Sequence, residues 1–191
     1  MVNVRVLFYF KMYSDASTST RLFLAALPDT AAALRISRLA ASLKRAHGLS
    51  GKLIALDRLH VSLFFLGRLP GDASCTARAE DGELPIAPFE VRFDRTASFR
   101  GRLGNRPFVL IGGDGLNELK SFRRRLATWL AGNGFKRLAK TNFEPHVTLL
   151  YDARTIDEYP LAEPVCWTVR EIVLIQSRRG HTYLARWRLS A

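Results

Sequence analysis

Two short segments of this 191-residue chain carry the same polar residues in the same order. The first reads Leu-His-Val-Ser-Leu at 59–63, and the second reads Pro-His-Val-Thr-Leu at 145–149. Because side chains alternate between the two faces of a β-strand, each segment would place its histidine and its hydroxyl residue on one face. The candidate functional residues are therefore His60 with Ser62, and His146 with Thr148.

Two imidazoles and two hydroxyls that converge on one site suit acid–base chemistry on a phosphodiester. An imidazole is close to half-protonated near neutral pH, so one ring can accept a proton while the other donates one. Hydroxyl groups can hydrogen-bond the non-bridging phosphate oxygens. A cyclic phosphate is strained, so positioning and proton transfer can suffice without a metal ion. A single histidine in an apolar strand is more often a core or edge residue, but two matched segments among four histidines favour an active site.

The surroundings of the two segments repeat as well. Each is preceded by an expected strand and an Asp-capped helix, at 21–28 and 30–47 in the first half and at 108–111 and 116–131 in the second. His60 follows Phe23 by 37 residues, and His146 follows Val109 by the same number. Two similar lobes that face each other would bring the histidine segments together. Strand–helix–strand units are common, so the repeat alone would not decide the matter.

The rest of the chain gives a coarser map. A half-buried strand is expected at 89–93, a basic loop at 100–106, a loop with Pro160 and Pro164 after residue 151, and a final hairpin at 170–177 and 182–189. A short helix is expected near 74–80. We interpret residues 1–20 as a loose N-terminal extension and residues 21–191 as a single domain.

Composition narrows the class of protein. The net charge of +12 favours polyanionic partners such as nucleic acid or phosphate esters, although a basic surface alone would also account for it. Neither Cys75 nor Cys166 lies in a zinc-binding pattern, and reducing cytoplasm is the expected compartment. The apolar run at 6–10 is too short for a membrane span or a signal peptide, and we expect a monomer.

These residues carry a resemblance to a known family. The stretches HVSL and HVTL at 60–63 and 146–149 match the paired H-x-(S/T)-x motifs of the 2H phosphoesterase superfamily. More narrowly, the chain resembles the bacterial RNA 2′,3′-cyclic phosphodiesterases, also known as 2′-5′ RNA ligases. The supporting stretches are RLFLAALP at 21–28, LHVSLFFLG at 59–67, FEPHVTLL at 143–150 and REIVLIQSRRG at 170–180.

The resemblance implies an α+β, bilobal fold with two antiparallel sheets related by a pseudo-twofold, outer helices and a central cleft. It implies hydrolysis of RNA 2′,3′-cyclic phosphate ends to a 2′-phosphate, without a cofactor or metal ion. His60 would be the proton donor and His146 the proton acceptor, while Ser62 and Thr148 would position the phosphate. The sequence itself is symmetric as to which histidine is the acid.

One position departs from the family pattern. Relatives often have an arginine where this chain has Tyr151, so the family pattern does not show which residue is the positive partner of the phosphate. Arg154, Arg178 or the 100–106 loop could supply it, or each could be a solvated surface charge. Phe64 and Phe143 could stack a base beside the cleft, and Tyr151 could pack or stack, but core packing of both phenylalanines is equally open.

Two other functions stay open at this stage. The same site could act on a small cyclic phosphate or on 2′-5′ linked oligonucleotides, or catalyse the reverse ligation. Alternatively, the basic charge could mark an RNA-binding module without catalysis.

Overall fold

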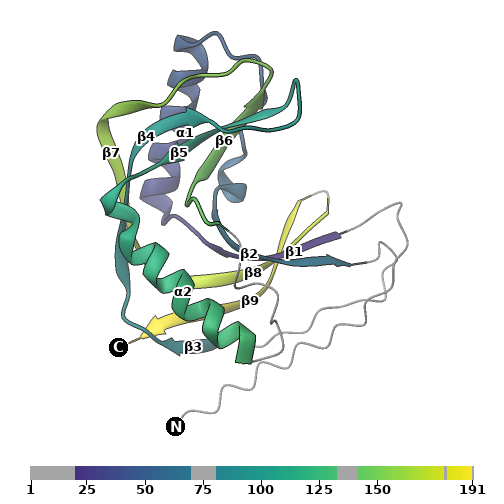
Figure 1. The fold of residues 1–191 in the computed structure, drawn as a ribbon, viewed down its shortest axis with the longest axis vertical. Helices are drawn as coiled ribbons and strands as arrows, with labels where there is room; N and C mark the ends of the chain where they lie inside the picture. Colours follow the sequence, from purple (N-terminus) through teal and green to yellow (C-terminus); the bar gives the residue numbers. More distant parts are fainter. Residues whose placement is uncertain (1–19, 70–80, 133–141, 179, 191) are drawn as a thin grey trace.

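The computed structural model describes residues 20–69, 81–132, 142–178 and 180–190 (Figure 1). In these ranges the strands are β1 (Thr20–Ala26), β2 (Val61–Leu69), β3 (Gly82–Pro85), β4 (Phe89–Ser98), β5 (Arg106–Ile111), β6 (Val147–Asp152), β7 (Tyr159–Val169), β8 (Glu171–Ser177) and β9 (His181–Ser190). The helices are α1 (Thr30–Ala46) and α2 (Asn117–Gly132), with 3-10 turns η1 (Leu56–Arg58) and η2 (Asp114–Leu116). The expected helix near 74–80 and the extension before Thr20 lie outside the described residues.

The strands form one sheet in the order β3-β9-β8-β1-β2-β6-β5-β4-β7. All neighbouring strands are antiparallel except β3 and β9. The expectation of two separate sheets is therefore wrong, since the two halves meet edge to edge. Their junction is a single residue pair, Val61 with Val147, which are the valines of the two histidine motifs. The α+β class is confirmed.

Both helices help to join the two halves of the sheet. Helix α1 follows β1 but lies against β6 and β7 (Figure 1). There Arg35 forms an ion pair with Glu163 at 2.7 Å. Helix α2 follows β5 and begins beside β4, and its C-terminal turns then cover the other half. There Leu126 and Trp129 line a small cavity together with Trp187 of β9. This crossing joins the two halves into one core. No helix in the described part of the chain is long and apolar enough to cross a membrane.

The two aspartates expected to cap the helices behave differently. Asp29 caps α1, because its carboxylate accepts a hydrogen bond from the Ala32 N–H at 2.8 Å. Helix α1 ends before Gly48, whose φ of +59° is the left-handed conformation that favours glycine. Asp114 instead opens η2, and its carboxylate accepts from the Asn117 side chain. The expected cap of α2 by Asp114 is therefore wrong.

Strand β7 lies where a loop was expected. Its sequence contains Pro160 and Pro164, and proline cannot donate to a strand ladder. The prolines are tolerated because β7 is an edge strand, paired on one side only, with β4. The short strand β3, which the sequence did not indicate, forms the opposite edge.

Strand β2 contains irregularities that interrupt the expected alternation. Along β1, Ala25 pairs with Ser62 but the next residue, Leu24, pairs with Phe64, so β2 has an extra residue there. As a result Phe64 turns into the core, with 3% of its surface exposed, and Phe65 is 50% exposed on the face of Ser62. Strict alternation from His60 and Ser62 would put Phe64 on their face, and the extra residue is the reason that it does not lie there.

Candidate active site

The two motif histidines are held in the same way. His60 and His146 each stand directly before a strand, in the residue preceding β2 and β6. The Nδ1 of His60 donates to the Arg58 carbonyl at 2.8 Å, and that of His146 donates to the Glu144 carbonyl, also at 2.8 Å. Because a carbonyl oxygen can only accept, Nδ1 carries the hydrogen in both rings. The Nε2 of each ring is therefore the nitrogen that can gain or lose a proton in catalysis.

The sheet register arranges the four polar residues of the motifs. The two motif valines are antiparallel partners. In that register His60 lies opposite Thr148, and Ser62 lies opposite His146. Imidazoles and hydroxyls thus alternate at the corners of a square, with the Cα atoms of diagonal neighbours roughly 7–8 Å apart. The four side chains therefore face one space above the sheet.

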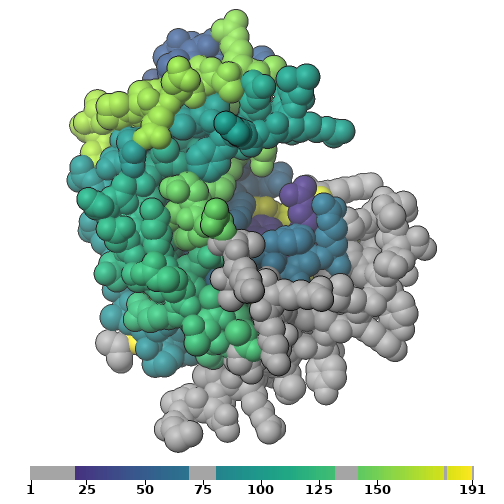
Figure 2. Space-filling view, in the orientation of Figure 1, coloured from purple at the N-terminus to yellow at the C-terminus, as the bar shows by residue number. Residues whose placement is uncertain are grey.

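A cavity of about 680 Å³ opens over this square. Figure 2 shows the hollow between the teal turn that joins β4 to β5 and the purple, blue and yellow atoms of β1, β2, β8 and β9. Both halves of the sheet line it, with Arg21, Phe23, Ile54, Arg58, His60, Ser62, Phe65, Arg68, Asn105, His146, Thr148, Tyr151, Ser177, Arg178 and His181. The structure therefore brings all four motif residues to one cavity.

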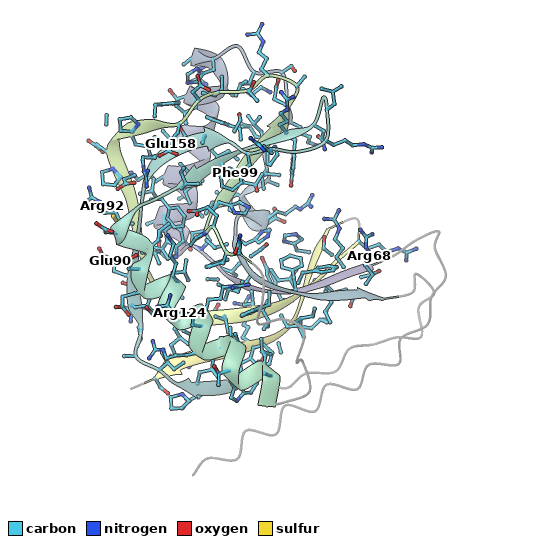
Figure 3. All side chains as sticks on the ribbon, in the orientation of Figure 1. Arg68, Glu90, Arg92, Phe99, Arg124 and Glu158 are labelled. Carbon is cyan, nitrogen blue, oxygen red and sulfur yellow. The ribbon has the colours of Figure 1, made fainter. Side chains whose placement is uncertain are left out.

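An aromatic ring supports each histidine from its own half. The ring of Phe23 lies 5.0 Å from that of His60, and Phe99 lies 5.0 Å from His146 (Figure 3). The His60 Nε2 is 3.0 Å from the Ser62 hydroxyl. Burial lowers the pKa of His60 below 6.5, the hydrogen bond to the Arg58 carbonyl partly opposes this, and the positive charges of His146 and Arg58 lower it further.

A third histidine lies beside this pair. The sequence places His181 in the turn of the final hairpin, but it is the first residue of β9 and lines the cavity. Its ring is 5.2 Å from that of His60 and 5.6 Å from that of Phe23. Burial and the charges of His60 and Arg58 lower the pKa of His181 to about 4, so this ring is neutral near neutral pH. The β8–β9 hairpin carries it there, because β8 in turn pairs with the distant strand β1.

The other residues proposed from the sequence separate into two groups. Tyr151 and Arg178 line the cavity, and so does Asn105 of the basic loop. Arg154 does not line it, since its side chain donates to the His47 carbonyl at the end of α1. Phe143 does not line it either.

Phe64 and Phe143 share a structural role instead. The guanidinium of Arg123 in α2 lies 4.3 Å from the ring centre of Phe64 and 4.4 Å from that of Phe143. Its Nε donates to the Leu63 carbonyl at 2.9 Å, within the irregular part of β2. These contacts support core packing for both phenylalanines. The exposed ring beside the motif is that of Phe65, which the alternation of a regular strand did not indicate.

Metal-binding groups were also sought in the described ranges. There, no three His, Cys, Asp or Glu side chains come together in a way that could hold a metal ion. Cys166 is a free, exposed thiol on β7.

Sequence comparison agrees with this geometry. A family model described as the 2′-5′ RNA ligase superfamily matches residues 27–181. The chain therefore belongs to this superfamily of 2H phosphoesterases. Among proteins with curated descriptions, none shows significant similarity.

Solved structures support the same fold. The chain is similar to Escherichia coli LigT in its apo form, with a TM-score of 0.60 and 25% identity over 92% of this chain and 100% of that one. It also resembles LigT complexed with 3′-AMP, with a TM-score of 0.55, 26% identity and the same coverage of 92% and 100%. The protein TT0787 of Thermus thermophilus matches with a TM-score of 0.58, 21% identity and coverage of 88% and 97%, which supports the fold alone.

Proposed function

We propose that this protein hydrolyses RNA 2′,3′-cyclic phosphate ends to a 2′-phosphate, without a metal ion or cofactor. The matched anchoring of the two histidines carries the proposal, because each Nδ1 hydrogen is bound to a backbone carbonyl and each Nε2 is left for proton transfer. The proposal includes two lobes related by a pseudo-twofold, in agreement with a strand order that mirrors itself about the β2–β6 junction apart from β3.

In the proposed reaction, water attacks the phosphorus while the bond to the 3′ oxygen breaks. The Nε2 of His146 takes a proton from the attacking water, and the protonated Nε2 of His60 gives a proton to the leaving 3′ oxygen. Ser62 and Thr148 hydrogen-bond the non-bridging oxygens. Exchange with solvent then returns His60 to its protonated form and His146 to its neutral form.

Two observations support an RNA end as the substrate. LigT, which this chain resembles at 26% identity, has been crystallised with 3′-AMP, a nucleotide with a terminal phosphate. Four arginines line the cavity of this chain, and the net charge of the whole chain is +12. Both features favour the binding of an anionic substrate. The proposal includes a cytoplasmic location and a monomeric state. Gel filtration can check the monomeric state.

The test is incubation of a short oligonucleotide that ends in a 2′,3′-cyclic phosphate, with and without EDTA. We expect turnover in EDTA and a 2′-phosphate product. His60→Ala and His146→Ala should each lower kcat by about 10²–10⁴, the usual contribution of a general acid or base. His47→Ala is the matched control, because His47 bonds Tyr159 at 2.8 Å and does not line the cavity.

Other results would point elsewhere. If the His60→Ala/His146→Ala double variant still opened the cyclic phosphate, the site assignment would be wrong. Salt-dependent RNA binding without turnover, unchanged in both variants, would indicate an RNA-binding module instead. A panel with small cyclic phosphates and 2′-5′ linked dinucleotides separates the remaining substrates by their products.

A further inference from the structure

The positive charge of the cavity comes from one half of the sheet only. Its four arginines belong to β1, β2, η1 and the β8–β9 turn. The second half contributes Asn105, Tyr151 and the residues of its motif, none of them a lysine or arginine. Among the described residues that line the cavity, none is aspartate or glutamate. An anion between the motifs would therefore meet cationic side chains from the first half.

The four arginines differ in burial and position. Arg21, Arg68 and Arg178 are exposed, whereas Arg58 is half-buried. Arg21 and Arg68 face each other across the β1–β2 pair, and Figure 3 shows Arg68 far along β2. Arg58 stands two residues before His60, and its own carbonyl holds the His60 ring. Arg58 is thus the arginine tied directly to the reacting histidine.

The side chain of Arg58 has a donor without an acceptor. Its Nε is buried, yet it has no hydrogen-bond partner among the described residues. A buried donor without a partner is rare and destabilising in a folded protein. A guanidinium stays charged and presents its N–H groups in a planar fork that matches phosphate oxygens. Because the Arg58 side chain also lines the cavity, a guanidinium with an unsatisfied donor there points to an anionic ligand.

We propose that Arg58 binds a non-bridging oxygen of the phosphate. Arg58 then supplies the positive charge that Tyr151, in the second half, does not carry. This assignment rests on the proposed function and adds a binding residue to it. The charge of Arg58 acts on both neighbouring imidazoles, since it lowers the pKa of His60 and of His181. The same field stabilises a negative charge placed between them.

The turn that carries Arg58 is held in place. Its backbone N–H donates to the Ala55 carbonyl at 2.9 Å. The Tyr183 hydroxyl of β9 donates to the Asp57 carbonyl, also at 2.9 Å. The following residue, Leu59, is buried in the core. A guanidinium on such a turn is positioned before the ligand arrives, which reduces the entropy lost on binding.

The experiment measures binding of inorganic phosphate by calorimetry, which needs no turnover. Arg58→Gln should weaken phosphate binding by about tenfold or more, the effect of losing a charge-assisted hydrogen bond. Arg58→Lys keeps the charge but not the fork, and should bind with intermediate affinity. Arg154→Gln removes the same charge outside the cavity and should bind like the wild type. Equal affinities for the Arg58→Gln and Arg154→Gln variants would refute the proposal.

A second measurement uses the wild-type chain, in case the variants do not fold. The NMR signal of the Arg58 Nε–H should shift on titration with phosphate, together with the His60 ring signals. A His60 shift without an Arg58 shift would overturn the assignment. The wild type could fail to open a cyclic phosphate while Arg58→Gln still binds inorganic phosphate more weakly than the wild type. In that case the proposed function is wrong and the Arg58 site stands.

Discussion

His60 and His146 share their anchoring but differ in their surroundings. His60 lies beside the ring of His181 and close to the guanidinium of Arg58. His146 packs against Phe99, a neutral ring. Burial and the positive neighbours make the protonated form of His60 less favourable than that of a free imidazole. The surroundings of the two motif histidines therefore differ, although the motif sequences are symmetric.

This asymmetry predicts where activity falls on the pH scale. As proton donor, His60 must carry its proton, and in the free protein it loses that proton below the ordinary 6.5. One of the two limbs of kcat/KM should therefore lie below pH 6.5, because kcat/KM reports the free enzyme. A bound phosphate anion favours the protonated ring, so the same limb should lie at higher pH in kcat.

The control for this pH profile is an NMR titration of the His60 ring. Its midpoint should coincide with one of the two limbs of kcat/KM. A midpoint that coincides with neither limb would show that His60 is not one of the two reacting groups. The profile has the same shape for either assignment of donor and acceptor, so its limbs belong to the pair.

Among the elements, β2 has the strongest influence on the site. Its extra residue turns Phe64 inward and Phe65 outward, and Arg123 of α2 bonds the carbonyl of Leu63 within that irregular stretch. A regular strand would have exposed Phe64 and buried Phe65. Helix α2 thus helps to set which aromatic ring faces the cavity, and Phe65 becomes the candidate for stacking a base.

Replacing Arg123 tests this link. Arg123→Met keeps an apolar stem but loses the hydrogen bond to Leu63 and both ring contacts, so the free energy of unfolding should fall by about 2–3 kcal/mol. Chemical denaturation measures it. Arg124→Met, on the exposed side of the same helix (Figure 3), should change stability by less than about 0.5 kcal/mol. Equal losses in the two variants would contradict a specific role for Arg123.

The sequence predicts those elements whose signals are local. The two histidine motifs, the Asp29 cap, the end of α1 at Gly48 and the final hairpin follow from residue types and spacing. Strand β7 was missed because its prolines signal a loop unless the strand is known to be an edge. The β2 irregularity and the position of His181 depend on partners distant in the sequence, which periodicity does not report.

In the whole molecule, the two halves of the sheet pair through only one residue pair, so other contacts must hold them together. The crossed helices provide such contacts, and so does Asp152 at the end of β6. Its carboxylate accepts from the backbone N–H groups of Ser50 and Gly51, both at 2.7 Å, and from that of Arg154 at 2.9 Å. Gly51 packs so closely that a Cβ there would lie 1.9 Å from the Tyr151 carbonyl oxygen. The loop after α1 is thus fastened to β6.

We therefore expect the contribution of Asp152 to the free energy of unfolding to be lost in acid. The backbone hydrogen bonds, that from Arg154 first, lower the pKa of Asp152 from 3.8 to about 2. A lowered carboxylate pKa means that the unfolded chain binds more protons between these values. Its stabilising effect is thus complete above 3.8 and is lost as the pH falls toward 2.

Asp152→Asn should remove this contribution, because the amide replaces one accepting oxygen by an NH2 group. That NH2 group would face backbone N–H donors and could not accept from them. We expect a loss of about 1–3 kcal/mol at pH 7, measured by urea unfolding, and a smaller difference from the wild type as the pH falls toward 2. Asp157→Asn, at an exposed carboxylate, is the matched control and should leave stability nearly unchanged. A difference between Asp152→Asn and the wild type that stayed constant from about pH 5 to pH 2 would mean that the carboxylate charge is not what fastens the loop to β6.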